Sequence, residues 1–286
     1  MELIRAARDL RLLTDARRAA GETVGLVPTM GALHEGHASL IRRARDERAF
    51  VVVSIFLNPL QFGPGEDLAA YPRDEASDLT FCEQLGVDAV WAPTQDEVYP
   101  PGVALPAPDP GPVGQQLEGA ARPGHFAGVL KVVHRLFDVT GPCAAYFGRK
   151  DAQQLFLVRR MVAEMDLPVQ VVACPTVREP DGLACSSRNA RLSAHDREQA
   201  GCVFLALSEA AALSRAGERD ARVLVATMAR EIGATPRASL DYVAVVDDAD
   251  FQPVLTIEPG RVALALAAVR FAGARLIDNL TLPEPA

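Results

Sequence analysis

The chain has 286 residues, of which 49% are hydrophobic and 23% are charged, with 29 basic and 37 acidic residues and a formal net charge of -8. This length suffices for a main domain that carries a smaller one, and the apolar content excludes an intrinsically disordered chain. Because the net charge is negative, no broad positive field is present, and nucleic acid is not expected as a partner.

Three further features bear on where the protein works. The longest apolar run, residues 262–269, is well short of the roughly 18 to 20 residues of a membrane-spanning helix, and charged residues interrupt the N-terminal segment where a secretory signal would be apolar. The five cysteines are scattered and form no C-x-x-C pair, which argues against a disulfide framework and a zinc ribbon. We expect a cytoplasmic protein with no membrane partner.

The basic residues are almost all arginine, because Lys131 and Lys150 are the only lysines. A lysine that remains in such a chain can mark a position that needs a compact ammonium group, although chance survival explains it equally well. The same reasoning applies to the three asparagines, Asn58, Asn189 and Asn279.

Short apolar runs, typical of strands buried on both faces, alternate with helical spacing over the first 175 residues. Strands are expected at residues 23–27, 50–56, 89–92, 144–147 and 169–173, with a proline-rich loop at 100–112. This β-α order predicts an α/β fold with a doubly wound parallel, Rossmann-like sheet. Ligands of such sheets bind at the carboxyl ends of the strands.

The pattern changes near residue 176. Helical stretches at 194–213 and 219–232 precede β-like runs at 240–246, 261–269 and 274–280, which predicts a smaller C-terminal α+β domain. We therefore divide the chain into a Rossmann-like domain, residues 1–176, and an α+β domain, residues 177–286.

The first predicted strand leads into Met30-Gly31-Ala32-Leu33-His34-Glu35-Gly36-His37, and a helix is expected to begin near His37. Two imidazoles three residues apart, beside the N–H groups of a helix N-terminus, are typical of an anion site. Zinc chelation and a structural turn are the alternatives. Zinc is disfavoured because the histidines stand in no H-E-x-x-H frame and the cysteines supply no further ligands.

Neutral amides follow the second strand, at Asn58 and Gln61, where they could bind the hydroxyl and carboxylate groups of a small polar substrate. An Asx turn explains Asn58 equally well but does not explain Gln61. Arg122 and His125 form a further basic pair at the start of a predicted helix.

The fourth strand is followed by Gly148-Arg149-Lys150-Asp151, in which Lys150 could bind phosphate and Asp151 ribose hydroxyls, with Gln154 one turn further on. Ser186, Ser187 and Arg188, after Cys185, offer further phosphate donors. The alternative for Lys150 and Asp151 is an exposed turn without a ligand, and the alternative for residues 185–189 is a capped loop. The sequence has no Walker A, G-x-G-x-x-G or G-x-S-x-G motif, which disfavours the P-loop, dinucleotide and α/β-hydrolase classes.

The H-x-G-H motif at residues 34–37 resembles the signature of nucleotidyltransferases and class I aminoacyl-tRNA synthetases. Taken together, the segments between residues 24 and 192 closely resemble the pantoate:β-alanine ligase (pantothenate synthetase) family. The likeness is carried by the motifs at 28–37, 58–62, 71–73, 122–126, 147–151 and 186–189. Arg149 and Cys185 depart from the family, which usually has an acidic residue and a methionine at these positions.

The resemblance implies a two-step ligation, in which pantoate and ATP form pantoyl adenylate and pyrophosphate, and β-alanine then displaces AMP. It implies catalytic roles for His34, His37 and Lys150, and Mg²⁺ bound to the triphosphate with no assigned protein ligand. It also implies a homodimer and a C-terminal domain that acts as a lid over the site. The implied ATP site comprises residues 30–37 and 148–151 with Val177, Cys185, Ser186, Ser187 and Arg188, and the implied pantoate and β-alanine site comprises Asn58, Gln61, Arg122, His125 and Gln154.

Two other functions remain open from the sequence. A nucleotidyltransferase that transfers AMP to a small acceptor would share H-x-G-H and the fold, and a regulatory module would bind the nucleotide without turnover. AMP release that depends on an amine distinguishes the ligase from the first, and turnover of ATP distinguishes it from the second.

Overall fold

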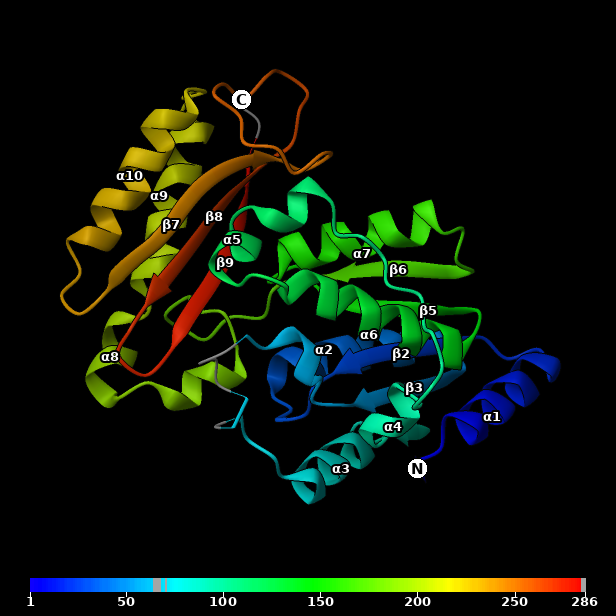
Figure 1. Ribbon diagram of the computed structural model, residues 1–286. Helices are drawn as coiled ribbons and strands as arrows, with labels where there is room; N and C mark the ends of the chain where they lie inside the picture. The colour runs from blue at the N-terminus through cyan, green and yellow to red at the C-terminus, as the bar shows by residue number, and fades with distance from the viewer. Residues whose placement is uncertain (64–67, 70, 284–286) are drawn as a thin grey trace. The chain divides into compact units, whose positions relative to one another are not determined.

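A computed structural model describes residues 1–63, 68–69 and 71–283, and the chain forms two compact units (Figure 1). The first unit consists of residues 1–148 and 153–175, and the second of residues 149–152 and the chain from 176 onward. The short segment 149–152 therefore packs with the C-terminal part of the chain although it lies between β5 and α7 of the first unit.

A six-stranded sheet forms the centre of the first unit, with strand order β1-β4-β3-β2-β5-β6 and parallel pairing throughout. The strands are β1 Glu2–Ile4, β2 Val24–Thr29, β3 Phe50–Ile55, β4 Ala89–Trp91, β5 Cys143–Gly148 and β6 Val169–Cys174. The five predicted strands and the parallel sheet are confirmed. Strand β1 was not predicted, because its first two residues are exposed and it lacks the apolar run of a buried strand.

The order of the strands reverses between β2 and β5, which makes this the topological switch point of the sheet. Thr29 pairs with Ile55 and Gly148 with Cys174. The carboxyl ends of β2, β3, β5 and β6 therefore finish at one edge. The loops that follow β2 and β3 therefore begin at this edge. After β5 and again just after β6, the chain passes from the first unit into the second.

The longer helices of the first unit cover both faces of this sheet (Figure 1). The helices of the unit are α1 Ala7–Ala19, α2 Glu35–Glu47, α3 Glu75–Gln84, α4 Gln95–Val98, α5 Glu118–Ala121, α6 His125–Thr140 and α7 Ala152–Glu164, with 3₁₀ turns η1 Pro59–Gln61 and η2 Pro112–Gln115. Fully buried apolar side chains such as Val27, Ile41 and Val53 fill the space between α2 and the strands. Residues 103–110 contain no helix or strand, as the proline content predicts.

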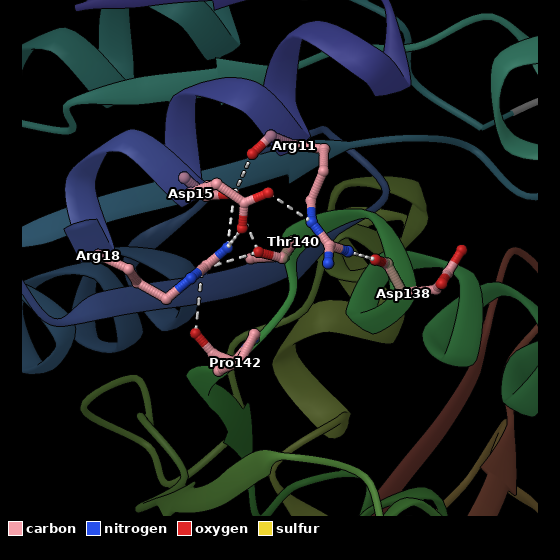
Figure 2. A network of polar contacts seen from close by, with 7 residues as sticks. Arg11, Asp15, Arg18, Asp138, Thr140 and Pro142 are labelled. Carbon is pink, nitrogen blue, oxygen red and sulfur yellow. Dashed lines mark hydrogen bonds and ion pairs between the residues drawn. The ribbon is translucent and has the colours of Figure 1, made fainter.

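Helix α1 is attached to the connection between α6 and β5 by a polar network, shown in Figure 2. Arg11 donates a hydrogen bond to the carbonyl of Asp138 over 2.7 Å, and Arg18 donates to the carbonyls of Thr140 and Pro142 over 3.0 and 3.1 Å. Hydrogen bonds from Arg18 and then Arg11 hold the pKa of Asp15 below its ordinary value. The Asp138 and Thr140 carbonyls lie in the last turn of α6, where carbonyls lack helical partners and arginine can satisfy them.

The second unit contains η3 Ser187–Arg191, α8 Ala194–Gln199, α9 Cys202–Arg215 and α10 Ala221–Gly233, followed by the antiparallel sheet β7 Ser239–Asp247, β8 Ala263–Arg270 and β9 Arg275–Leu282. Helices α9 and α10 pack on one face of this sheet through Leu207, Leu224 and Met228. The α+β composition is as predicted. A single helix over 194–213 was wrong, because the chain turns at Ala200 and Gly201, where glycine is a poor helix former.

No helix within the described residues is long and apolar enough to cross a membrane.

Candidate active site

The loop between β2 and α2 carries the first motif. Two buried polar side chains, Thr29 and Asp78, hold its main chain by hydrogen bonds. Thr29 donates its hydroxyl to the carbonyl of Ser54 over 2.7 Å and accepts the N–H of Gly31 over 3.2 Å. The carboxylate of Asp78, on α3, accepts the N–H groups of Ala32 and Leu33 over 2.9 and 2.8 Å. Burial raises the pKa of Asp78, and the two N–H groups oppose that shift.

Gly31 is required where this loop passes Asp78. Its φ is +81°, and a Cβ there would lie 2.8 Å from Oδ2 of Asp78. Only glycine combines that conformation with so close a contact at low cost. Asp78 was not among the predicted site residues.

His34 and His37 form a capping box at the start of α2, which begins at Glu35 rather than near His37. The N–H of Gly36 donates to Nδ1 of His34 over 3.1 Å, and the N–H of His34 donates to Nδ1 of His37 over 3.3 Å. Since an Nδ1 that accepts an N–H carries no proton, each neutral ring carries its proton on Nε2. The ring centroids are 4.2 Å apart. The pair thus presents two Nε2–H donors beside a helix N-terminus, which suits an anion.

The amides after β3 form a buried cluster. Asn58 accepts the N–H of Leu60 over 3.2 Å, which is the Asx turn considered above, but it also accepts the hydroxyl of Tyr99 over 2.9 Å. Its Nδ2 donates to Oε1 of Gln61 and to the carbonyl of Gly128, both over 3.1 Å. Asn58 is therefore fully used inside the protein, and its role toward Gln61 is to orient the amide.

Gln61 lies next to the β2–α2 loop, because its Nε2 donates to the sulfur of Met30 over 2.8 Å. A thioether is a weak acceptor, so a substrate hydroxyl or carboxylate could take this N–H instead. The close approach of α6 fixes the site of Gln61, since a Cβ at Gly128 would lie 2.1 Å from the carbonyl oxygen of Leu60.

Arg122 and His125 meet at the main chain of Gln61. Nδ1 of His125 lies 2.8 Å from this carbonyl oxygen, and Nη2 of Arg122 donates to it over 3.2 Å. A carbonyl oxygen only accepts, so the His125 proton is on Nδ1, and Nε2 accepts Nη1 of Arg122 over 3.0 Å. The structure thus joins Asn58, Gln61, Arg122 and His125, which the sequence had proposed separately.

Helix α7 buries Gln153, the residue that precedes the predicted substrate ligand Gln154. Gln153 donates to the carbonyls of Val113 and Gln116 over 2.7 and 2.9 Å and accepts the N–H of Glu118 over 3.1 Å. It attaches the segment before α6 to α7 and has a structural role. Gln154 is half-buried.

In the second unit, Lys150 stands in a turn held by β9. Nδ2 of Asn279 donates to the carbonyls of Arg149 and Lys150 over 2.9 and 2.8 Å. The Lys150 ammonium lies 3.7 Å from the carboxylate of Asp151, and its side chain is 17% exposed. The Lys150 side chain is thus less exposed than the alternative interpretation, an exposed turn, predicts.

The predicted loop 185–189 follows a small hairpin. The N–H of Cys185 donates to the carbonyl of Val177 over 2.9 Å, and Arg178 and Ala184 form a β-bridge. Ser186 caps η3 by accepting the N–H of Arg188 over 3.3 Å, as the capped-loop alternative predicts. Asn189 donates to the carbonyl of Ala184 over 3.0 Å and closes the loop on itself. A capped loop does not prevent Ser187 and Arg188 from binding phosphate.

Among the residues that the structure describes, no group of three or more His, Cys, Asp or Glu side chains could hold a metal ion.

The protein-family model described as pantoate-beta-alanine ligase matches residues 2–281. The chain belongs to this family. The pantothenate synthetase of Roseiflexus sp. (strain RS-1) is 51% identical over 282 residues, which cover 99% of each chain. Members of the pantoate-beta-alanine ligase family thus match this chain over nearly its whole length, including the C-terminal hundred residues, where the sequence motifs gave no evidence.

Solved structures of the family have the same fold. The pantothenate synthetase of Thermus thermophilus superposes with a TM-score of 0.90 at 45% identity, covering 98% of this chain and 99% of that one. The pantoate-beta-alanine ligase of Francisella tularensis, crystallised with beta-gamma ATP and beta-alanine, gives a TM-score of 0.78 at 31% identity, covering 98% of this chain and 97% of that one.

Proposed function

We propose that the chain ligates pantoate and β-alanine to pantothenate at the expense of ATP, through pantoyl adenylate. The carboxylate of pantoate attacks the α-phosphorus and pyrophosphate leaves; the amine of β-alanine then attacks the acyl carbon and AMP leaves. Membership of the family supports the reaction. The observation that supports the site is the pair of Nε2–H donors of His34 and His37 at the topological switch point of the sheet.

The β2–α2 loop would bind the phosphates of ATP. Negative charge builds on the phosphates as the carboxylate attacks, and preorganised N–H donors stabilise it without reorganising. His34 and His37 are preorganised because the main chain fixes both Nδ1 atoms. His37 would in addition donate a proton, and Glu35, paired with Arg42, would contribute its main chain.

The amide cluster would bind pantoate. Gln61 is the member with an N–H on a weak acceptor, so we assign it to the hydroxyl or carboxylate of pantoate, and we keep Gln154 as a second candidate. Arg122 and His125 would act through the main chain of Gln61, and their basic character also suits the carboxylates of the two substrates.

The second unit would supply Lys150, Ser186, Ser187 and Arg188 to the phosphates, with Asp151 on the ribose and Val177 and Cys185 beside the adenine, and it would act as a lid that keeps water from the adenylate. Mg²⁺ would be bound by phosphate oxygens and water, the usual mode for this ion beside nucleotides. We also propose a cytoplasmic homodimer, which light scattering of the purified protein would test.

The experiment is turnover of ATP with pantoate and β-alanine, with AMP, pyrophosphate and pantothenate measured together. We expect the three products in equal amounts and no AMP without the amine. Equal AMP release without β-alanine, or a product that retains AMP, would instead support the nucleotidyltransferase. Absence of turnover would leave the regulatory module.

A further inference from the structure

Each of the three asparagines of the chain donates its side-chain amide to at least one main-chain carbonyl in or beside a proposed site segment. Asn58 binds Gly128 beside Gln61, Asn189 closes the 185–189 loop, and Asn279 binds the turn that carries Lys150. Asn279 is far from any motif in the sequence. Its contacts, which all lie within the second unit, suggest a role in the reaction.

Two consecutive carbonyls face Asn279, and a primary amide is suited to both. One NH₂ group offers two N–H donors from a single atom, whereas a hydroxyl offers one and a carboxylate offers none. The two distances, 2.9 Å to Arg149 and 2.8 Å to Lys150, are those of good hydrogen bonds. Both carbonyls belong to the turn that leads into α7, so the amide fixes the main chain from which the Lys150 side chain extends.

Asn279 is itself held firmly. Its main-chain N–H donates to Oδ1 of Asp278 over 2.8 Å, and its carbonyl accepts Nη2 of Arg178 over 3.2 Å. Arg178 forms a two-pronged ion pair with the buried carboxylate of Asp278 and stacks on Phe204, with Cζ 4.4 Å from the ring centroid. Burial raises the pKa of Asp278, and Arg178 foremost, with Lys150 as a smaller contribution, opposes the shift.

The same cluster reaches the second phosphate segment. Arg178 donates to the carbonyl of Gly182 over 3.0 Å and forms the β-bridge that precedes Cys185. Strand β9 thus supports both the Lys150 turn, through Asn279, and the hairpin that leads to residues 185–189, through Asp278.

We propose that Asn279 is a positioning residue for Lys150, which holds the 149–150 main chain in the conformation from which the ammonium binds the phosphates of ATP. This inference rests on the proposed function. Adenylation should depend on Asn279 because it uses the phosphates, whereas attack of β-alanine on pantoyl adenylate should not, because no pyrophosphate is present in that step. A displacement of about 1 Å can cost up to roughly a hundredfold in rate.

The test compares the two half-reactions in Asn279→Ala, Asn279→Asp and Asn279→Ser. Adenylation is followed as pantoate-dependent pyrophosphate exchange, and amide formation as AMP release from synthetic pantoyl adenylate and β-alanine. We expect adenylation to fall at least about tenfold in the Ala and Asp variants and less in Ser, which keeps one donor, with amide formation within about twofold of wild type. Thr281→Ala, an exposed position on the same strand, is the matched control and should alter neither rate.

A double-mutant cycle with Lys150→Ala identifies the residue through which Asn279 acts. If Asn279 positions Lys150, Asn279→Ala should cost little further adenylation in the Lys150→Ala background. An equal loss in both half-reactions, an undiminished loss in that background, or a Lys150→Ala variant with normal adenylation would each overturn the inference. Wild-type protein without any exchange would overturn the proposed function itself.

Discussion

The main-chain N–H of His34 donates a hydrogen bond to Nδ1 of His37 over 3.3 Å, so the first histidine of the motif fixes the ring of the second. The contact is half of the capping box that starts α2, and it engages Nδ1, the ring nitrogen opposite the Nε2 that we assign to catalysis. Structure and proposed catalysis therefore use opposite edges of one imidazole.

We predict that His37→Ala lowers the adenylation rate by at least about a hundredfold, the usual loss when a donor to a developing charge is removed. His37→Gln is the informative partner, because Gln at this position of a capping box still accepts the N–H of the N-cap residue. It should be as slow as His37→Ala but more stable to heat. Normal pyrophosphate exchange by His37→Gln would show that His37 only caps the helix and takes no part in adenylation. His195→Ala, at an exposed site, is the control.

Gln61→Ala should impair the use of pantoate far more than the use of ATP. The amide N–H now directed at the sulfur of Met30 is the group that we assign to pantoate. Equilibrium binding by calorimetry, with each substrate alone, checks the assignment, and Gln84→Ala, exposed at the end of α3, serves as control. Unchanged pantoate affinity together with weaker ATP binding would show that the two subsites are assigned wrongly.

Asp78→Asn should lower the free energy of unfolding by about 1 to 3 kcal/mol, because one of the N–H groups of Ala32 and Leu33 loses its acceptor. Burial raises the pKa of Asp78, so the native state binds this proton at a higher pH than the unfolded chain. The wild type should thus gain stability relative to Asp78→Asn as the pH falls from the raised pKa toward the ordinary value near 3.9.

Urea denaturation across this pH range measures both effects. Glu75→Gln, on the same helix but in an exposed ion pair with Arg5, should cost less than about 1 kcal/mol. A stability difference for Asp78→Asn that is zero at every pH would show that the carboxylate does not hold the loop.

Cys185 offers a chemical report on nucleotide binding. We predict that saturating ATP slows its alkylation by iodoacetamide in the native protein, since the side chain is only half-buried and lies in the proposed adenine loop. Cys82 and Cys143 are internal controls, because burial raises the pKa of each thiol to about 12 and leaves almost no thiolate to react near neutral pH. Peptide mass mapping gives the rates, and a Cys185 rate unaffected by ATP would contradict its placement.

The sequence predicted what local pattern determines. Apolar runs predicted β2 to β6 correctly, and the order of His34 and His37 after a strand indicated the candidate anion site, which stays a prediction. Asp78 gave no signal, because its contact with Leu33 joins positions 45 residues apart. Gln153 and Gln154 are adjacent, and only the rotation of α7 against residues 113–118 decides which one is buried. The sequence predicts the start of α2 too late, near His37, because histidine is not a usual N-cap residue.

Asn279 illustrates the same limit at the C-terminal end. Composition marked it as rare, but no spacing relates it to Lys150, because the turn at 149–150 and strand β9 meet only in the folded second unit.

The most direct test of the account is pantoate-dependent exchange of labelled pyrophosphate into ATP without β-alanine. A ligase that works through an acyl adenylate must form it reversibly before the amine arrives, and a closed site should protect it from water. We predict exchange that requires pantoate, loss of exchange in His37→Gln, and discharge of the bound adenylate to pantothenate and AMP in a single turnover when β-alanine is added. Exchange that occurs only when β-alanine is present would contradict the intermediate and require a concerted reaction instead.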